Sequence, residues 1–135
     1  MLKRFSIPVS KKSIVDFLEI LRKDLQASKV QRELTPIMVA TEEILVNILH
    51  HSGLRAQDTI QIVCKIEGEK CVELSFTDCG KAYDLGQVTT LESIQSIDKR
   101  PLGGCGIPLL RQFSDFIDCQ RMGGKNVVKL IKFLK

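Results

Sequence analysis

Tryptophan is absent from this 135-residue chain, and tyrosine occurs once. Surfaces that bind nucleic acid usually combine a basic stripe with aromatic side chains. Here the net charge is divided, at +5 over residues 1–32, −7 over residues 33–98 and +6 over residues 99–135. The acidic middle and the scarcity of aromatic residues argue against direct nucleic-acid binding. Solvated surfaces account for the basic ends.

Long apolar runs are also missing. No stretch approaches the roughly 18–20 apolar residues that span a bilayer. The first eight residues, MLKRFSIP, lack the apolar centre of a signal peptide. We therefore expect a cytoplasmic protein that does not associate with a membrane. The 44% of hydrophobic residues can form the core of a single domain, residues 1–135.

The sequence also lacks the cysteine motifs that bind metal ions. The five cysteines include no CxxC pair, and the two histidines are adjacent in sequence. This composition argues against a zinc site. Reduced cysteines are expected in a cytoplasmic protein, several of them as small core residues.

Apolar periodicity predicts three helices. Residues 11–27 form an amphipathic helix with Ser10 or Ser13 as its cap. A second helix starts with Thr35 as N-cap and Pro36 at its first position, and it ends near His51. A third is expected over about residues 107–115.

Alternating residues predict the strands, which are an edge strand at 2–9, a hairpin of 60–66 and 72–76, and strands near 116–122 and 126–134. A long loop, residues 84–103, interrupts this order and has the length of a functional lid. The order indicates an α+β two-layer sandwich, with a mostly antiparallel sheet and helices on one face.

Polar residues recur every four positions on the second helix, at Glu43, Asn47 and His51. This spacing puts them on one face. A carboxylate and an amide oxygen one turn apart can hold hydrated magnesium or orient a water. The alternative is an ordinary solvent-exposed helix face.

Asp78, Cys79 and Gly80 follow an apolar strand directly. Asp78 can accept a hydrogen bond from an exocyclic amine such as that of adenine, and Gly80 lets the backbone approach a flat ring. The alternative is a turn or capping residue.

Glycines precede the third helix in the run Gly103-Gly104-Cys105-Gly106. Their amides can converge on a phosphate at the helix N-terminus, although helix-entry turns also use glycine. The P-loop pattern is absent, and no strand precedes the run as a Rossmann motif requires. The lid could add its Ser/Thr hydroxyls, with Lys99 and Arg100 at its end, or it could be a solvated loop.

The order of these motifs resembles the Bergerat fold of the GHKL-type ATPases. Within that superfamily the chain most resembles the bacterial anti-sigma factors that are also serine-protein kinases in partner-switching systems. The resemblance covers almost the full length. Its motifs are an N-box from Glu43 to His51, glycine boxes at residues 78–84 and 103–107, and the closing hairpin at residues 123–128.

The resemblance implies ATP and Mg²⁺ as cofactors, with Asn47 as magnesium ligand and Glu43 as the group that activates the attacking hydroxyl. It implies that Asp78 binds the adenine amino group and that Gly80 lies beneath the ring. The phosphates would lie along Gly104, Cys105 and Gly106.

Two positions depart from the family pattern. Ala82 stands where many members have a second glycine, and the ring can still enter beside this small residue. No threonine occurs in residues 116–135, whereas many relatives place one near the adenine. Arg100 is a candidate for the lid arginine.

The function implied by the resemblance is that of an anti-sigma factor with serine/threonine-protein kinase activity. Such a protein phosphorylates an anti-anti-sigma (STAS-domain) protein and sequesters a sigma factor, and it acts as a homodimer. The alternative is a non-catalytic binding module that sequesters a regulatory partner and holds nucleotide only as a ligand, or holds none.

Overall fold

The computed structural model describes residues 1–82 and 113–135. In chain order the elements are β1 (Leu2–Pro8), α1 (Lys11–Ala27), α2 (Leu34–His51), β2 (Thr59–Glu67), β3 (Cys71–Asp78), β4 (Phe116–Met122) and β5 (Lys125–Phe133). The lid expected at residues 84–103 lies outside the described residues, as does most of the helix expected at 107–115.

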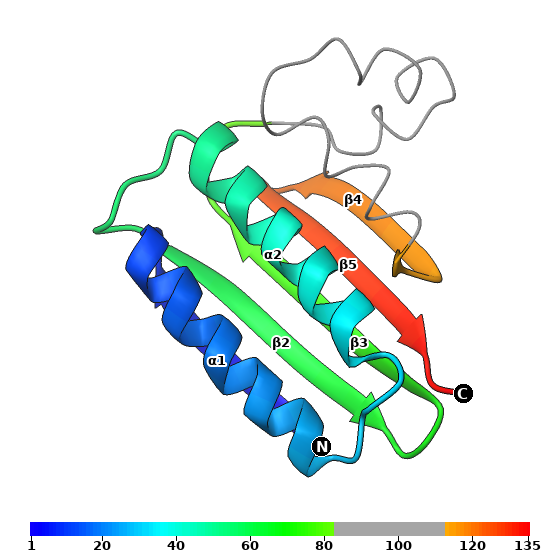
Figure 1. Ribbon diagram of the computed structural model, residues 1–135. Coiled ribbons are helices and arrows are strands. Elements are labelled where there is room, and N and C mark those ends of the chain that lie inside the picture. The colour runs from blue at the N-terminus through cyan, green and yellow to red at the C-terminus, as the bar shows by residue number, and fades with distance from the viewer. Residues whose placement is uncertain (83–112) are drawn as a thin grey trace, which may run out of the picture.

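The five strands form one antiparallel sheet in the order β1-β2-β3-β5-β4. Helices α1 and α2 lie side by side on one face of this sheet, α1 over β1 and β2, and α2 over β3 and β5 (Figure 1). The predicted α+β two-layer sandwich is therefore confirmed, and so is the edge position of the first strand. No helix in the described ranges is both long enough and apolar enough to cross a bilayer.

The turns of both hairpins contain glycines in left-handed conformations. Gly68, between β2 and β3, has φ of 52°. Gly123 and Gly124, between β4 and β5, have φ of 56° and 77°. Two successive positive φ angles match the twist of a tight hairpin, and glycine adopts them without steric cost. Both predicted hairpins are confirmed.

The start of α1 is as predicted, and the start of α2 is not. Ser10 caps α1 by accepting a hydrogen bond from the amide of Ser13. Helix α2 begins at Leu34, and Glu33 precedes it without a side-chain cap, so the prediction of Thr35 as N-cap was wrong. Proline loses no helical hydrogen bond anywhere in the first turn, and Leu34 packs against the core. The helix therefore starts two residues earlier than expected.

The core fills the space between the sheet and the two helices. Phe17 of α1 is 1% exposed and meets Phe5 of β1 edge to face, with ring centroids 5.1 Å apart. Cys64 is also buried, and burial raises the pKa of its thiol to about 11. Cys64 is thus a core residue, as expected of some cysteines. Cys71 and Cys79 are free thiols too.

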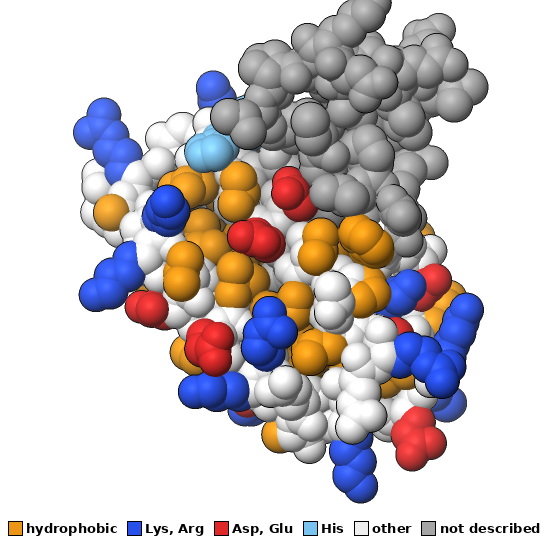
Figure 2. All heavy atoms as spheres, in the orientation of Figure 1, with side chains coloured by type: hydrophobic (Ala, Val, Ile, Leu, Met, Phe, Trp, Pro, Cys, Tyr) orange, Lys and Arg blue, Asp and Glu red, His pale blue; other side chains and the backbone are white. Residues whose placement is uncertain are grey.

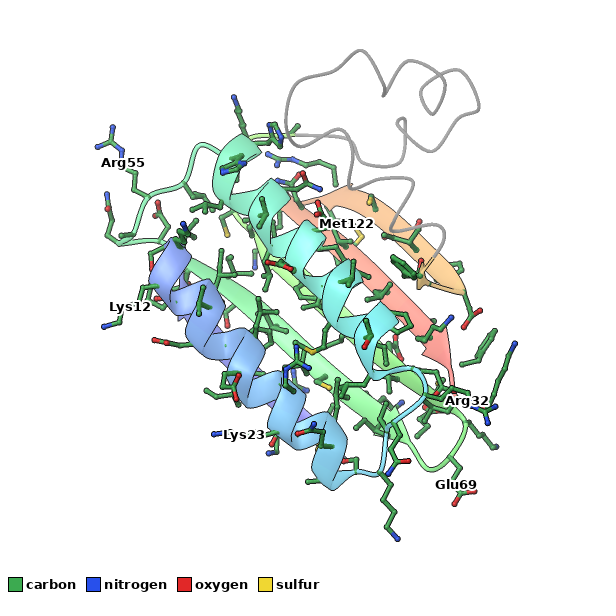
Figure 3. All side chains as sticks on the ribbon, in the orientation of Figure 1. Lys12, Lys23, Arg32, Arg55, Glu69 and Met122 are labelled. Atoms are coloured by element: carbon green, nitrogen blue, oxygen red, sulfur yellow. The ribbon has the colours of Figure 1, made fainter. Side chains whose placement is uncertain are left out.

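Charged side chains surround this core on the outside. Lys12, Lys23 and Arg55 point away from the body of the molecule (Figure 3). On the outer side of the helix layer, hydrophobic side chains gather between charged ones (Figure 2). A shallow hollow between α1 and α2 lies there, lined by Val15, Leu18, Glu19, Arg22, Thr35, Met38, Val39 and Glu42.

Candidate nucleotide site

Asp78 ends β3 and is 1% exposed. Its Oδ1 atom accepts two hydrogen bonds, from the amide of Gly80 at 2.9 Å and from Nδ2 of Asn126 at 3.0 Å. The first bond folds the chain back immediately after the strand. The second ties the carboxylate to β5. Asp78 is therefore both a turn residue and a buried, oriented acceptor, so the two interpretations of this residue are compatible.

Three polar residues form a row across the ends of three neighbouring strands. Asn126 of β5 is opposite Asp78 of β3 in the sheet register, and Arg121 of β4 is opposite Asn126. The guanidinium Nη1 of Arg121 donates to the carbonyl of Gly80 at 2.7 Å and to Oδ1 of Asn126 at 3.0 Å. Asn126 Nδ2 also donates to the carbonyl of Lys81 at 2.9 Å. The row fixes the loop that follows β3.

Gly80 lies against the end of helix α2. A Cβ atom at this position would be 2.5 Å from the carbonyl oxygen of Ser52 and 2.6 Å from its Cβ. The amide of Lys81 donates to the same Ser52 carbonyl at 2.9 Å. The need for glycine here comes from packing against α2, a reason that the sequence did not reveal. The contact joins the end of the N-box helix to the Asp78 loop.

The polar stripe of α2 runs from the interior to the surface. Asn47 is 1% exposed, and its Nδ2 has no hydrogen-bond partner in the described part of the chain. Glu43, one turn earlier, is half-buried, and burial together with the neighbouring Glu42 raises the pKa of its carboxyl. His51 is exposed. An exposed helix face is therefore the wrong interpretation for Asn47.

A pocket of about 260 Å³ adjoins the row of polar residues. Its lining consists of Ala82, Cys119, Gln120, Arg121, Asn126, Val127 and Val128. Ligand pockets commonly exceed roughly 300 Å³. The pocket is thus smaller than a typical ligand pocket. Ala82, one of the residues proposed from the sequence, is among the lining residues.

Several predicted residues cannot be placed. Gly104, Cys105 and Gly106 lie outside the described residues, as does Arg100. No cluster of three His, Cys, Asp or Glu side chains able to hold a metal occurs within residues 1–82 and 113–135.

Arg121, Asn126 and Ser52 were not among the residues chosen from the sequence. One signal for Asn126 was present. It precedes Val128 and Leu130 in the alternating pattern of β5, and all three residues are buried on the same face. A buried amide in an apolar row requires polar partners. Nothing comparable marks Arg121, whose side chain is exposed overall.

The chain is similar to known proteins over nearly its whole length. Residues 7–132 match the family described as the Histidine kinase-like ATPase domain. A chain in the crystal structure of the SiaB-SiaC complex from Pseudomonas aeruginosa has the same fold, with 18% sequence identity and a TM-score of 0.66. The alignment covers 98% of this chain and 89% of that one. No curated protein matches the chain by sequence. The superfamily resemblance found in the motifs is thus confirmed, and the chain belongs to the histidine kinase-like ATPase domain family.

Proposed function

We propose that this protein is a partner-switching regulator that binds ATP and transfers its γ-phosphoryl group to a serine or threonine of an anti-anti-sigma protein. Family membership implies ATP binding. The kinase proposal depends on one observation, the pairing of a buried, unsatisfied Asn47 with a half-buried Glu43 one turn away on α2. A module that only bound a partner would not require this pair.

The described residues fit a nucleotide with magnesium. Leaving a buried amide donor unpaired costs about 1–3 kcal/mol, so the Nδ2 of Asn47, which has no partner among the described residues, would gain from donating to a phosphate oxygen of a bound nucleotide. The amide oxygen of Asn47 is a ligand type that Mg²⁺ accepts. Asn47 would help to hold magnesium, which supplies neutralisation of the phosphate charge when it is bound. At the other end, Asp78 would accept from the adenine amino group beside Ala82.

Glu43 would act on the protein substrate. As the serine or threonine oxygen forms its bond to the γ-phosphorus, the bond to the β-phosphate oxygen breaks, and the hydroxyl proton passes to the Glu43 carboxylate. A raised pKa makes this carboxylate a better proton acceptor than a fully solvated glutamate. Gly104, Cys105 and Gly106 are proposed as the phosphate-binding residues.

The partners follow from the same resemblance. The structurally similar chain comes from a two-protein complex, SiaB-SiaC, which supports a partner-binding role for this fold. We propose a STAS-domain protein as the phosphorylated partner and a sigma factor as the sequestered one, bound by a homodimer of this chain in the cytoplasm. The nucleotide state would select between the partners through its differential affinity for each complex.

The test combines nucleotide binding with phosphoryl transfer. Fluorescent ATP and ADP are titrated with and without magnesium, and Asn47→Ala should abolish the magnesium-dependent part. Transfer of labelled phosphate from ATP to STAS-domain proteins is then measured for Glu43→Gln, with Glu69→Gln, at an exposed glutamate between β2 and β3, as the matched control. Wild-type rates in Glu43→Gln would refute the proposed base role.

The alternative, a non-catalytic binding module, has a distinct signature in this experiment. The late-strand region has no threonine, and Ala82 replaces a family glycine. A protein that binds nucleotide, or none, and captures a partner without labelling it would support that alternative over the kinase.

A further inference from the structure

We infer that Arg121 is a positioning residue for base recognition, acting on Asp78 through Asn126. This inference rests on the proposed nucleotide site. Arg121 lies on the edge strand β4. In the sheet register it is opposite Asn126 of β5, which is in turn opposite Asp78 of β3. It was not predicted from the sequence, and the resemblance assigns it no role.

Arg121 contacts the side-chain amide of Asn126, whose orientation is set by its hydrogen bonds. Its Oδ1 accepts from the Arg121 guanidinium at 3.0 Å, while its Nδ2 donates to Asp78 Oδ1 at 3.0 Å and to the Lys81 carbonyl at 2.9 Å. If the amide were reversed, its oxygen would face two acceptors and its NH₂ group would face a cation. Arg121 and the two acceptors therefore favour the same orientation, the one that supplies a donor to Asp78.

Arg121 also contacts the loop that follows Asp78 at the end of β3. The same guanidinium nitrogen donates to the Gly80 carbonyl at 2.7 Å, and the Gly80 amide donates to Asp78 Oδ1 at 2.9 Å. Arg121 thus reaches Asp78 along two routes, through Asn126 and through Gly80. Two donors on one oxygen set the rotation of the carboxylate, which determines where an exocyclic amine can be accepted.

Arginine is suited to this position and lysine is not. The guanidinium presents several donors in a rigid plane, whereas the lysine ammonium is a compact charge on a flexible stem. Arg121 and Asn126 also line the pocket beside Ala82, so a shift of Arg121 changes the wall of that pocket as well as the support of Asp78. We therefore expect Arg121 to affect selectivity for the amino group of the base.

The experiment compares ATP with purine riboside triphosphate, which has hydrogen in place of the 6-amino group. Dissociation constants are measured in magnesium for wild type, Arg121→Gln, Arg121→Lys and Asn126→Ala. Arg4→Gln is the matched control, because Arg4 is an exposed arginine on the opposite edge strand, β1. Thermal unfolding of each variant shows that the comparison is made on folded protein.

Arg121→Gln should weaken ATP binding about tenfold, the equivalent of one charge-assisted hydrogen bond, and leave the analogue within about twofold of wild type. The ATP affinity of Arg121→Lys should lie between those of wild type and Arg121→Gln. Asn126→Ala should resemble Arg121→Gln, and Arg4→Gln should change the affinity for neither ligand. Equal weakening of both ligands would show a merely structural role and overturn the inference, as would unchanged ATP binding. Failure of the wild-type protein to bind ATP would instead overturn the proposed function, and this inference with it.

Discussion

Replacing Gly80 by alanine tests the junction between the Asp78 loop and helix α2. The added Cβ would lie 2.5 Å from the Ser52 carbonyl oxygen, 2.6 Å from the Ser52 Cβ and 3.0 Å from Asp78 Oδ1. The first atom is backbone, and the second belongs to a short side chain that is 2% exposed. None of them can move aside without moving the end of α2 or the buried carboxylate.

Overpacking of this kind typically costs 1–3 kcal/mol, and the rigidity of the contacts places Gly80→Ala at the upper end, about 2–3 kcal/mol. With about 2.1 cal/mol/K of unfolding entropy per residue, this cost lowers the Tm of the 135-residue chain by roughly 7–11 °C. Gly68→Ala is the control. Gly68 has φ of 52° and open space around it, so alanine there incurs only left-handed backbone strain, about 1 kcal/mol.

The assay is thermal unfolding by calorimetry together with ATP titration. Gly80→Ala should lose both Tm and ATP affinity, because the displaced loop carries Asp78. Gly68→Ala should lose roughly 4 °C and retain its affinity, since its turn lies at the opposite end of β3 from Asp78. A Gly80→Ala protein with the Tm and affinity of wild type would refute the packing argument.

Two further predictions concern Glu43 and the core. Burial raises the pKa of Glu43 in the folded state, so its stabilising contribution is present below the unfolded-state pKa and is lost as pH rises through the folded-state value. Glu43→Gln should therefore be more stable than wild type in urea at pH 7 and not at pH 4, and a pH-independent difference would contradict this. Phe17→Ala should cost about 3–5 kcal/mol, against about 0.5 kcal/mol or less for Phe133→Ala, because these rings are 1% and 54% exposed. Chemical denaturation of both variants checks this, and equal losses would count against the assigned core.

Local patterns in the sequence predicted most of the described fold. The alternation of Ile60, Ile62, Cys64 and Ile66 produced a strand with those four residues buried. Ser10 and the glycine turns also specify local geometry through their own chemistry. The prediction of Thr35 as N-cap was wrong because proline is tolerated at several positions within the first helical turn. The burial of Leu34, a tertiary effect, decides among them.

The candidate site could be predicted only in part, because some of its residues occur in local motifs and others are brought together by the fold. Asp78, Gly80, Glu43 and Asn47 occur in compact motifs whose spacing is visible in one dimension. The contacts of Asp78 with Asn126 and of Gly80 with Ser52 join residues 48 and 28 positions apart. The contact of Asp78 with Asn126 depends on the insertion of β5 between β3 and β4 and on its register. A shift by one residue would turn Asn126 to the other face of the sheet.

Asn126 also changes the meaning of the missing threonine. A threonine hydroxyl has one donor, whereas the asparagine amide has two, and here these reach Asp78 and the Lys81 carbonyl together. The amide oxygen of Asn126 also accepts a hydrogen bond, which Arg121 supplies from the neighbouring strand. Arg121 and Asn126 thus form one hydrogen-bonded unit that supports Asp78 although residues 116–135 contain no threonine.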